Sequence, residues 1–185
     1  MKITFIDIQN FRKLKNCRVE FSENKTVFVG ANNSGKTSAM DALMIFLKKT
    51  RRTDLSTTDF TLSNWKGINK IASDWIVNQD QNNLNLGAEI WYPQVPAVDV
   101  WLKVESNEIH YVSHIIPTLD WKGGNLGVRL IFEPKSIEEL YKAYKAAFQA
   151  AKSTSESRGE GNSLKLWPQT MRDFLDIELH EHFGV

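Results

Sequence analysis

The sequence predicts an α/β fold in which a strand leads through a glycine-rich loop directly into a helix. The β-branched and aromatic residues 26–29 predict the strand, and the apolar run 38–47 predicts a buried helix. Between them, residues 30–37 read Gly-Ala-Asn-Asn-Ser-Gly-Lys-Thr, which fits the phosphate-binding pattern G-x-x-x-x-G-K-T. Because strand, loop and helix come in the order that this pattern requires, we expect a P-loop nucleotide-binding fold with a mixed sheet and flanking helices.

The residue types in the loop suit the binding of a di- or triphosphate. Gly30 lets the chain leave the strand sharply, and Gly35 lets backbone N–H groups close around a phosphate. The first N–H groups of the following helix have no intrahelical partner, and the helix dipole is positive there. Lys36 is expected to reach the β- and γ-phosphates as the catalytic cation, and the Thr37 hydroxyl to ligate Mg²⁺. The predicted nucleotide-binding residues are Gly30, Ala31, Asn32, Asn33, Ser34, Gly35, Lys36, Thr37 and Ser38. The competing interpretation is a chance match in an Asn-rich turn.

The composition is that of a globular domain. The chain has 185 residues, 42% of them hydrophobic, which suggests one domain with a sizeable core. The lone Cys17 excludes an intrachain disulfide, and the first residues show no signal-peptide pattern. No apolar run approaches the roughly 20 residues of a membrane span. We therefore expect a cytoplasmic protein without membrane contact. A formal net charge of +1 neither demands nor excludes a nucleic-acid partner.

Two predicted strands precede the strand of the loop. They cover residues 3–9 and 18–21, and turn residues 22–25 follow. A small nucleotide kinase usually starts directly with the strand of its loop. The additional strands instead favour the antiparallel edge layer of an ABC-type ATPase head, which divides this part of the chain into edge strands (1–25) and loop with helix (26–50).

Several short segments together resemble a known family. They are Ile8-Gln9-Asn10-Phe11-Arg12, Phe21, residues 27–38, Asp41-Ala42-Leu43 and Thr58-Asp59-Phe60. The combination is similar to the N-terminus of the RecF, SMC and Rad50 group, and most of all to the ATPase domain of OLD-family (overcoming lysogenization defect) proteins. The resemblance covers residues 1–60.

The resemblance implies an ABC-type ATP site whose second half lies far along the chain, often followed by a Toprim nuclease domain. It implies ATP and Mg²⁺ as cofactors and an ATP-dependent homodimer of heads. It also implies a role with DNA, in repair or in antiviral defence, with a nuclease or defence-system partner. Arg12 is expected near the bound nucleotide by the same resemblance; the alternative is a solvated arginine in a turn.

Residues 51–152 are predicted as a helical and strand region. Apolar residues at helical spacing predict helices over 68–76 and 137–151, and strands are expected over 88–92, 98–104 and 126–132. The cations at 48–52 suit the C-terminus of the loop's helix, or a contact with a DNA backbone. A small polar run, 153–163, is expected to be a flexible linker. A terminal part, 164–185, should form a helix opened by Pro168 and a strand over 177–180.

Three groups that an ABC-type site requires are missing from the sequence or have at most a weak candidate in it. Glu133 ends a strand but is followed by Pro134, so it is not the acid expected to hold Mg²⁺. No Ser-Gly-rich signature occurs, and Gln94 is the one candidate for a glutamine that senses the γ-phosphate. We therefore expect the N-terminal lobe of a longer ATPase, which alone turns over little ATP. The alternatives are a self-contained small P-loop phosphotransferase or NTPase, and a regulatory module that uses nucleotide structurally.

Overall fold

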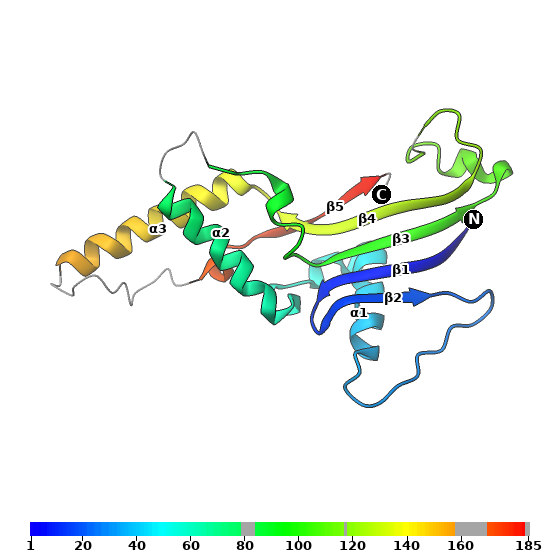
Figure 1. Ribbon diagram of the computed structural model, residues 1–185, viewed down its shortest axis with the longest axis horizontal. Coiled ribbons are helices and arrows are strands. Elements are labelled where there is room, and N and C mark those ends of the chain that lie inside the picture. Colours follow the sequence, from blue (N-terminus) through cyan, green and yellow to red (C-terminus); the bar gives the residue numbers. More distant parts are fainter. Residues whose placement is uncertain (79–83, 117, 158–169, 184–185) are drawn as a thin grey trace. The chain divides into compact units, whose positions relative to one another are not determined.

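The structure, a computed structural model, describes residues 1–78, 84–116, 118–157 and 170–183 (Figure 1). The α-helices and strands, in chain order, are β1 (Lys2–Phe11), β2 (Leu14–Glu20), α1 (Lys36–Leu47), α2 (Trp65–Val77), β3 (Ala97–Val104), β4 (Gly124–Pro134), α3 (Ile137–Ser157) and β5 (Ile177–Phe183). Short 3-10 helices cover Lys49–Asp54, Thr57–Asp59, Leu62–Asn64, Ala88–Ile90, Ser106–Tyr111 and Met171–Asp173. None of the helices in these described stretches has the length and apolar character needed to cross a bilayer.

The chain forms two compact units. The first comprises Met1–Leu62, Val95–Phe132 and Leu179–Val185, and the second Ser63–Gln94 and Glu133–Glu178. The strands form one sheet with the order β2-β1-β3-β4-β5. The pairs β1–β2, β1–β3 and β3–β4 are antiparallel. This antiparallel sheet with flanking helices fits the predicted class of P-loop ATPase head lobe.

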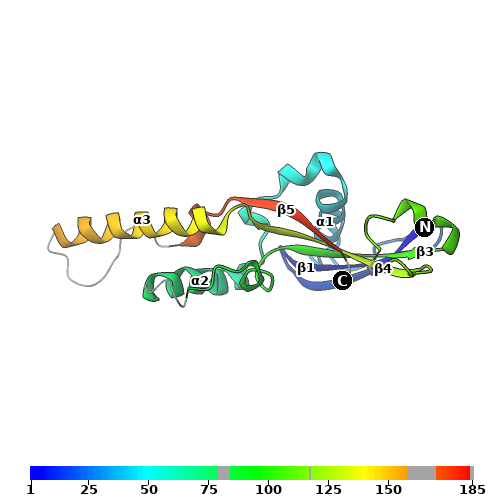
Figure 2. The same cartoon turned by 90° about the horizontal axis from the view of Figure 1, so that it is seen from above.

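Helix α1 packs on one face of the sheet in the first unit (Figure 2). Alternation along β1 turns Ile6 and Ile8 to a buried face, where both side chains are fully covered. Phe46 of α1 makes edge-to-face contacts with Phe11 at 6.3 Å and with Phe132 at 5.0 Å between ring centroids. Such aromatic pairs add to the free energy gained by burial, so the helix that follows the loop is held firmly against the sheet.

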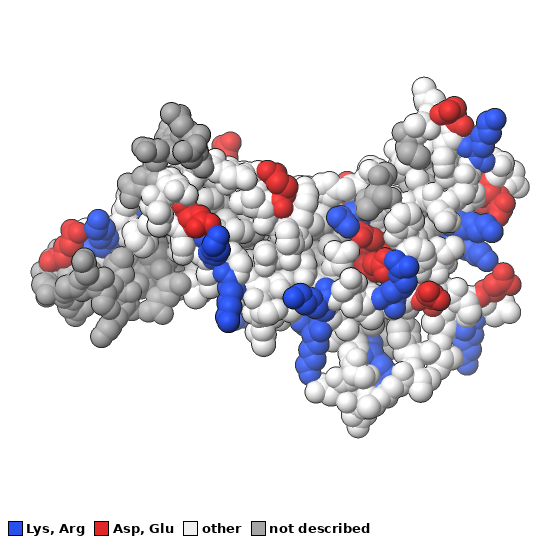
Figure 3. Space-filling view, in the orientation of Figure 1, with Lys and Arg blue, Asp and Glu red and all other residues white. Residues whose placement is uncertain are grey.

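A row of charged side chains crosses four strands of the sheet. Asp7 of β1 lies opposite both Arg18 of β2 and Asp99 of β3, and Asp99 lies opposite Arg129 of β4. Both arginines bind their carboxylates through two hydrogen bonds, at 2.8 and 2.7 Å for Arg18 and at 2.6 and 2.7 Å for Arg129. Figure 3 shows acidic side chains between basic ones on this surface. The like-charged pair Asp7 and Asp99 is thus flanked by an arginine on each side.

The second unit is built around aromatic side chains from α2 and α3. Trp75 of α2 is almost fully buried and contacts Tyr141 of α3 edge-to-face at 5.6 Å and Trp91 at 5.9 Å. Tyr144 of α3 contacts Phe174 edge-to-face at 5.3 Å. Burial raises the pKa of Tyr144. Helices α2 and α3 contain the ranges 68–76 and 137–151, so both predicted helices are confirmed.

Two predicted strands are absent. Residues 26–29 have no strand conformation, because no strand in the described part of the chain pairs with them. Residues 88–92 form the 3-10 helix Ala88–Ile90 and a turn that buries Trp91 completely. The apolar residues that predicted this second strand therefore fill a core from a turn, which strand propensity does not anticipate.

The end of α3 and the terminal part also differ from expectation. Helix α3 continues to Ser157, so the first five residues of the expected linker are helical, and 158–163 lie outside the described residues. Pro168 also lies outside them, and the part of the expected helix that is described forms the 3-10 helix Met171–Asp173. The strands expected over 98–104, 126–132 and 177–180 are confirmed as β3, β4 and β5.

Candidate functional site: the phosphate-binding loop

Gly35 shapes the junction between the loop and α1. It is the N-cap of α1 and has φ 94° and ψ 3°, a left-handed conformation that favours glycine. A Cβ at this position would lie 2.9 Å from Cδ2 of Leu14 in β2, closer than real Cβ contacts. The backbone angle therefore favours glycine where the pattern places it, whereas the contact with the end of the Leu14 side chain could be relieved by a small movement of that side chain.

The N-terminus of α1 offers free amide donors to an anion. The helix has no side-chain cap, so its first N–H groups lack the usual hydroxyl or carboxylate acceptor. Asn33, at φ 69°, is also left-handed. A hollow of about 210 Å³ opens there, lined by Lys13, Asn32, Asn33, Ser34, Gly35, Lys36, Thr37 and Ser38. Free amides and the positive end of a helix dipole make this hollow suited to phosphate.

Lys36 folds back over the loop. Its Nζ donates hydrogen bonds to the carbonyl oxygens of Gly30 at 2.5 Å and Ala31 at 2.6 Å, and lies 3.4 Å from Oγ of Ser34. These acceptors are neutral, and no carboxylate in the described residues forms a salt bridge with Lys36. Phosphate oxygens would be stronger acceptors for the ammonium group, because a charge-assisted hydrogen bond is about twice as strong as a neutral one.

A second, more apolar groove adjoins the hollow. It has a volume of about 430 Å³ and shares Ser34, Gly35 and Lys36 with the phosphate hollow. Its other lining residues come from β2, from the unpaired segment 26–30 and from α1: Leu14, Cys17, Arg18, Val19, Glu20, Thr26, Val27, Phe28, Val29, Gly30 and Ala39. Val29 is 88% exposed, so one wall of this groove is an apolar segment that the described residues leave uncovered.

Arg12 is bound by two carboxylates, and it lines neither the phosphate hollow nor the apolar groove. Its Nε donates to Asp59 at 2.7 Å, and its Nη1 donates to Asp41 of α1. Its backbone N–H also donates to the carbonyl oxygen of Asp59, at 2.6 Å. Partial burial lowers the pKa of Arg12, but the hydrogen bonds to Asp59 and then Asp41 outweigh it, so the pKa is raised overall. Arg12 therefore fixes α1 to the end of β1, and its expected closeness to nucleotide stays a prediction.

The Asn-Phe-Arg segment forms an unusual turn. Asn10 and Arg12 both have positive φ, at 56° and 51°, while Phe11 between them is completely buried. Asn10 accepts a backbone hydrogen bond from Thr61, at 3.2 Å, and its side-chain amide donates to the carbonyl oxygen of Val95 at the same distance. A left-handed arginine is strained by on the order of 1 kcal/mol, which its two ion pairs offset.

Lys13 is a site residue that the sequence did not reveal. It follows Arg12 in the turn between β1 and β2, lines the phosphate hollow, and donates from Nζ to Oδ1 of Asn33 in the loop. The loop pattern itself gave no signal for it, because Lys13 reaches the hollow only through the tight turn that joins two strands. Of the predicted residues, Asn32 to Ser38 line this hollow, Gly30 lines the groove, and Ala31 contributes a carbonyl oxygen to Lys36.

The hollow lacks the acidic groups of a complete hydrolytic site. None of the described residues that line it is an aspartate or glutamate. Nor does any cluster of three or more His, Cys, Asp or Glu suited to a metal occur within the described ranges. A hard cation prefers oxygen ligands, and Thr37 lines the hollow with a hydroxyl group, as Ser34 and Ser38 also do. The residues therefore fit a Mg²⁺ that is held largely by its nucleotide.

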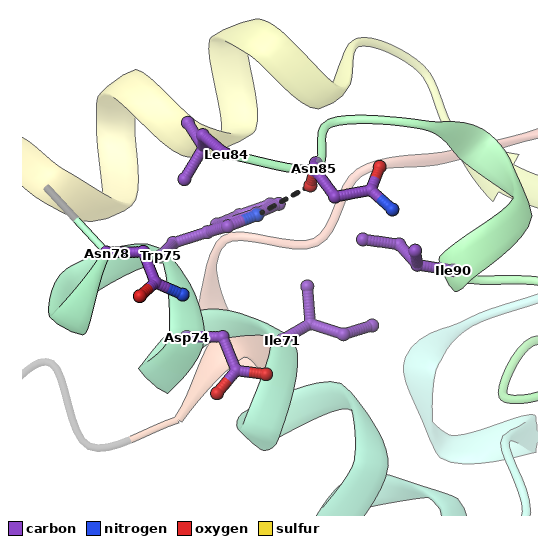
Figure 4. A pocket seen from close by; sticks show the side chains of 7 residues that line it. All are labelled: Ile71, Asp74, Trp75, Asn78, Leu84, Asn85 and Ile90. Atoms are coloured by element: carbon purple, nitrogen blue, oxygen red, sulfur yellow. Dashed lines mark hydrogen bonds between the residues drawn. The ribbon is translucent and has the colours of Figure 1, made fainter. Parts of the chain in front are cut away.

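A separate cavity in the second unit has a different character. It has a volume of about 250 Å³ and is lined by Ile71, Asp74, Trp75, Asn78, Leu84, Asn85 and Ile90 (Figure 4). Trp75 donates its indole N–H to the carbonyl oxygen of Asn85 at 3.4 Å. None of its described lining residues is a lysine or arginine, so this lining does not share the chemistry of the phosphate-binding loop.

Comparisons with known proteins identify the family of the chain. The family model of the AAA ATPase domain matches residues 1–166. The DNA replication and repair protein RecF of Nitrosococcus oceani is 44% identical over 45 residues, which cover 24% of this chain and 12% of that protein. RecF of Listeria welshimeri is 43% identical over 54 residues, 29% of this chain and 15% of that protein.

RecF of Lactobacillus acidophilus is 41% identical over 51 residues, 28% of this chain and 13% of that protein. The match thus spans no more than 15% of the length of these relatives. It is therefore the family model, with its match over most of the sequence, that carries the assignment: the chain belongs to the AAA ATPase domain family, in the ABC-type, RecF-like group of ATPases.

Proposed function

We propose that this chain is the ATP-binding lobe of an ATPase that acts with DNA. One observation carries the proposal: the loop 30–37 ends in a left-handed Gly35 at the uncapped N-terminus of α1, with Lys36 bound only to neutral oxygens. Amides, dipole and ammonium group converge on one hollow, where a polyphosphate would supply acceptors to the amides and an anionic partner to the ammonium group. We propose ATP rather than GTP because the sequence resembles a family of ATPases.

Mg²⁺ is the proposed cofactor of the bound nucleotide. Thr37 would hold it through its hydroxyl, next to the phosphate oxygens. When bound, such an ion neutralises charge that develops on the phosphates. The chain's own contribution is to orient the phosphates with loop amides and Lys36. The acid and the signature loop of a complete site would come from residues outside this hollow.

The partners are proposed from the relatives and the resemblance. The matched relatives are DNA replication and repair proteins by name, which supports an action with DNA. We propose that two heads dimerise around ATP, because none of the described lining residues supplies an acid to the hollow. An OLD-like identity, with a coupled nuclease domain or partner in repair or antiviral defence, is the most specific form of this proposal.

Substitution of Lys36 tests the proposal. In the full-length protein with Mg²⁺, Lys36→Ala is expected to weaken ATP binding at least about 100-fold, because the loss of a charge-assisted contact leaves the phosphates without their main cation. Isothermal titration calorimetry measures this directly. Lys142→Ala is the matched control. It removes an exposed lysine of α3 that lines neither the phosphate hollow nor the apolar groove, and it should bind ATP like the wild type.

The same variants separate the proposal from its alternatives. Lys36→Ala should abolish ATP hydrolysis and ATP-dependent dimerisation while thermal unfolding of the nucleotide-free protein stays unchanged. ATP binding that survives in Lys36→Ala would contradict the proposed site. Phosphoryl transfer by residues 1–185 alone would instead establish a self-contained phosphotransferase.

A further inference from the structure

The phosphate hollow holds a second cation besides Lys36. Lys13 lies in the turn between β1 and β2, and Lys36 is the first residue of α1, so two different elements bring their ammonium groups to one loop. Lys36 binds the start of the loop, at Gly30 and Ala31, whereas Lys13 binds its middle, at Asn33. The two cations therefore flank the same hollow from separate directions.

The position of Lys13 is fixed by its neighbour in the chain. Arg12 is anchored to Asp41 of α1 and to Asp59, and Leu14 pairs with Phe11 at the start of β2. The backbone on both sides of Lys13 is thereby held, although its side chain is exposed. Because Asp41 is on the helix that the loop opens, the same clamp sets the turn and the loop in one arrangement.

Neither lysine is neutralised. Among the described residues, no carboxylate forms a salt bridge with Lys13 or Lys36, and no acid lines the hollow. The partner of Lys13 is a neutral amide oxygen, which an anionic oxygen can replace with a stronger, charge-assisted bond. Two positive charges beside free helix amides form a site for an anion with more than one negative charge.

We propose that Lys13 is a second phosphate-contacting residue of the nucleotide site, which exchanges Asn33 for a phosphate oxygen when ATP binds. This inference rests on the proposed function, since it concerns the same hollow. It assigns to the turn between β1 and β2 a direct part in binding. The structural neighbour Arg12 then acts as a positioning residue, because it holds the backbone from which Lys13 extends.

Titration of MgATP into full-length Lys13→Ala tests the proposal. The affinity is expected to fall about 10-fold, the usual effect of losing one hydrogen bond to a charged group. Lys13→Arg keeps the charge and should bind within about 3-fold of the wild type. Lys15→Ala is the matched control: it removes an exposed lysine two residues away that lines neither hollow, and it should bind like the wild type.

Salt dependence distinguishes a phosphate contact from a structural role. The difference between wild type and Lys13→Ala should shrink in 1 M salt, where the Debye length falls to about 3 Å. Thermal unfolding of nucleotide-free Lys13→Ala should match the wild type, because the side chain is exposed.

Three outcomes overturn the inference. One is a Lys13→Ala protein that binds MgATP like the wild type, and another is a Lys13→Arg protein as weak as Lys13→Ala. In both cases, loss of binding in Lys36→Ala would leave the proposed function standing. In the third, wild-type protein that binds no nucleoside triphosphate would overturn the proposed function and this inference together.

Discussion

Strand β1 and residues 26–30 have similar sequences and different structures. Both are runs of β-branched and aromatic residues that predict a strand. Strand β1 has a partner on each side, and its Ile6 and Ile8 are completely buried. In residues 26–30, Val27 is 63% and Val29 88% exposed, and no described strand pairs with them. The comparison shows that strand propensity is realised only where a neighbouring strand completes the backbone hydrogen bonds.

The difference between the two regions also bears on the site. The phosphate-binding loop is joined to an unpaired segment on one side and to the well-packed α1 on the other. Its conformation is therefore maintained from the helix side, by Gly35, by the burial of Phe46 and by the Arg12–Asp41 ion pair. Substitutions in the paired strand, in the unpaired segment and in the clamp between them should have graded effects.

The largest effect is expected in the paired strand. Ile8→Ala removes a completely buried side chain between two strands and α1. We expect it to lower the free energy of unfolding by about 2–5 kcal/mol, from the lost transfer free energy and the cavity left behind. Urea denaturation followed by circular dichroism measures this loss.

Val29→Ala provides the matched substitution in the unpaired segment. Because 88% of Val29 is exposed, the free energy of unfolding of residues 1–185 should change by no more than about 0.5 kcal/mol. Equal losses in Ile8→Ala and Val29→Ala would show that the two regions are equally packed, and the contrast between them would be lost.

An intermediate effect is expected in the clamp that joins the two regions. Arg12→Ala leaves Asp59, whose side chain is only 9% exposed, without its ionic partner. We expect a loss of about 1–3 kcal/mol in the free energy of unfolding, the usual penalty for a charged group deprived of its hydrogen bond. Arg18→Ala removes a more exposed pair with Asp7 across β1 and β2, and should cost less than Arg12→Ala because solvent screens the exposed pair. A larger loss in Arg18→Ala than in Arg12→Ala would argue against the clamp.

The smallest effect concerns the first residue before β1. The amino group of Met1 donates to Glu108, and this hydrogen bond, followed by one from the backbone N–H of Glu105, lowers the pKa of Glu108. A lowered pKa contributes stability above the ordinary value of 4.5, and this contribution is lost as the pH falls through the folded-state pKa. Acetylation of Met1 should raise the pKa of Glu108 in an NMR titration. An unchanged pKa after acetylation would contradict the contact.

Much of the fold follows from local sequence patterns. Alternation predicted β1 and β5, strand-like runs bounded by proline or glycine predicted β3 and β4, and helical spacing predicted α2 and α3. The segments 26–29 and 88–92 carry the same apolar signal but differ in their surroundings, which a local pattern does not contain. Only the sheet order and the placement of Trp91 in a core show why these two are not strands.

The sequence also predicts one part of the candidate site and not the other. The loop residues are contiguous, so the pattern G-x-x-x-x-G-K-T located them without any knowledge of the fold. Lys13 and Asp41 join the site or its support through a strand turn and a helix face, distant in sequence from Asn33 and Asp59. Such contacts depend on tertiary packing. The resemblance named Arg12, and the structure adds a physical reason for an arginine at that left-handed position.

The row of charged side chains across the sheet favours one register of the strands. A one-residue slip of β3 against β1 would turn Asp99 to the opposite, apolar face of the sheet. Arg129 would then lose the carboxylate to which it donates two hydrogen bonds. Misaligned arrangements are thereby penalised electrostatically as well as sterically. The row therefore favours the observed strand register over its one-residue neighbours.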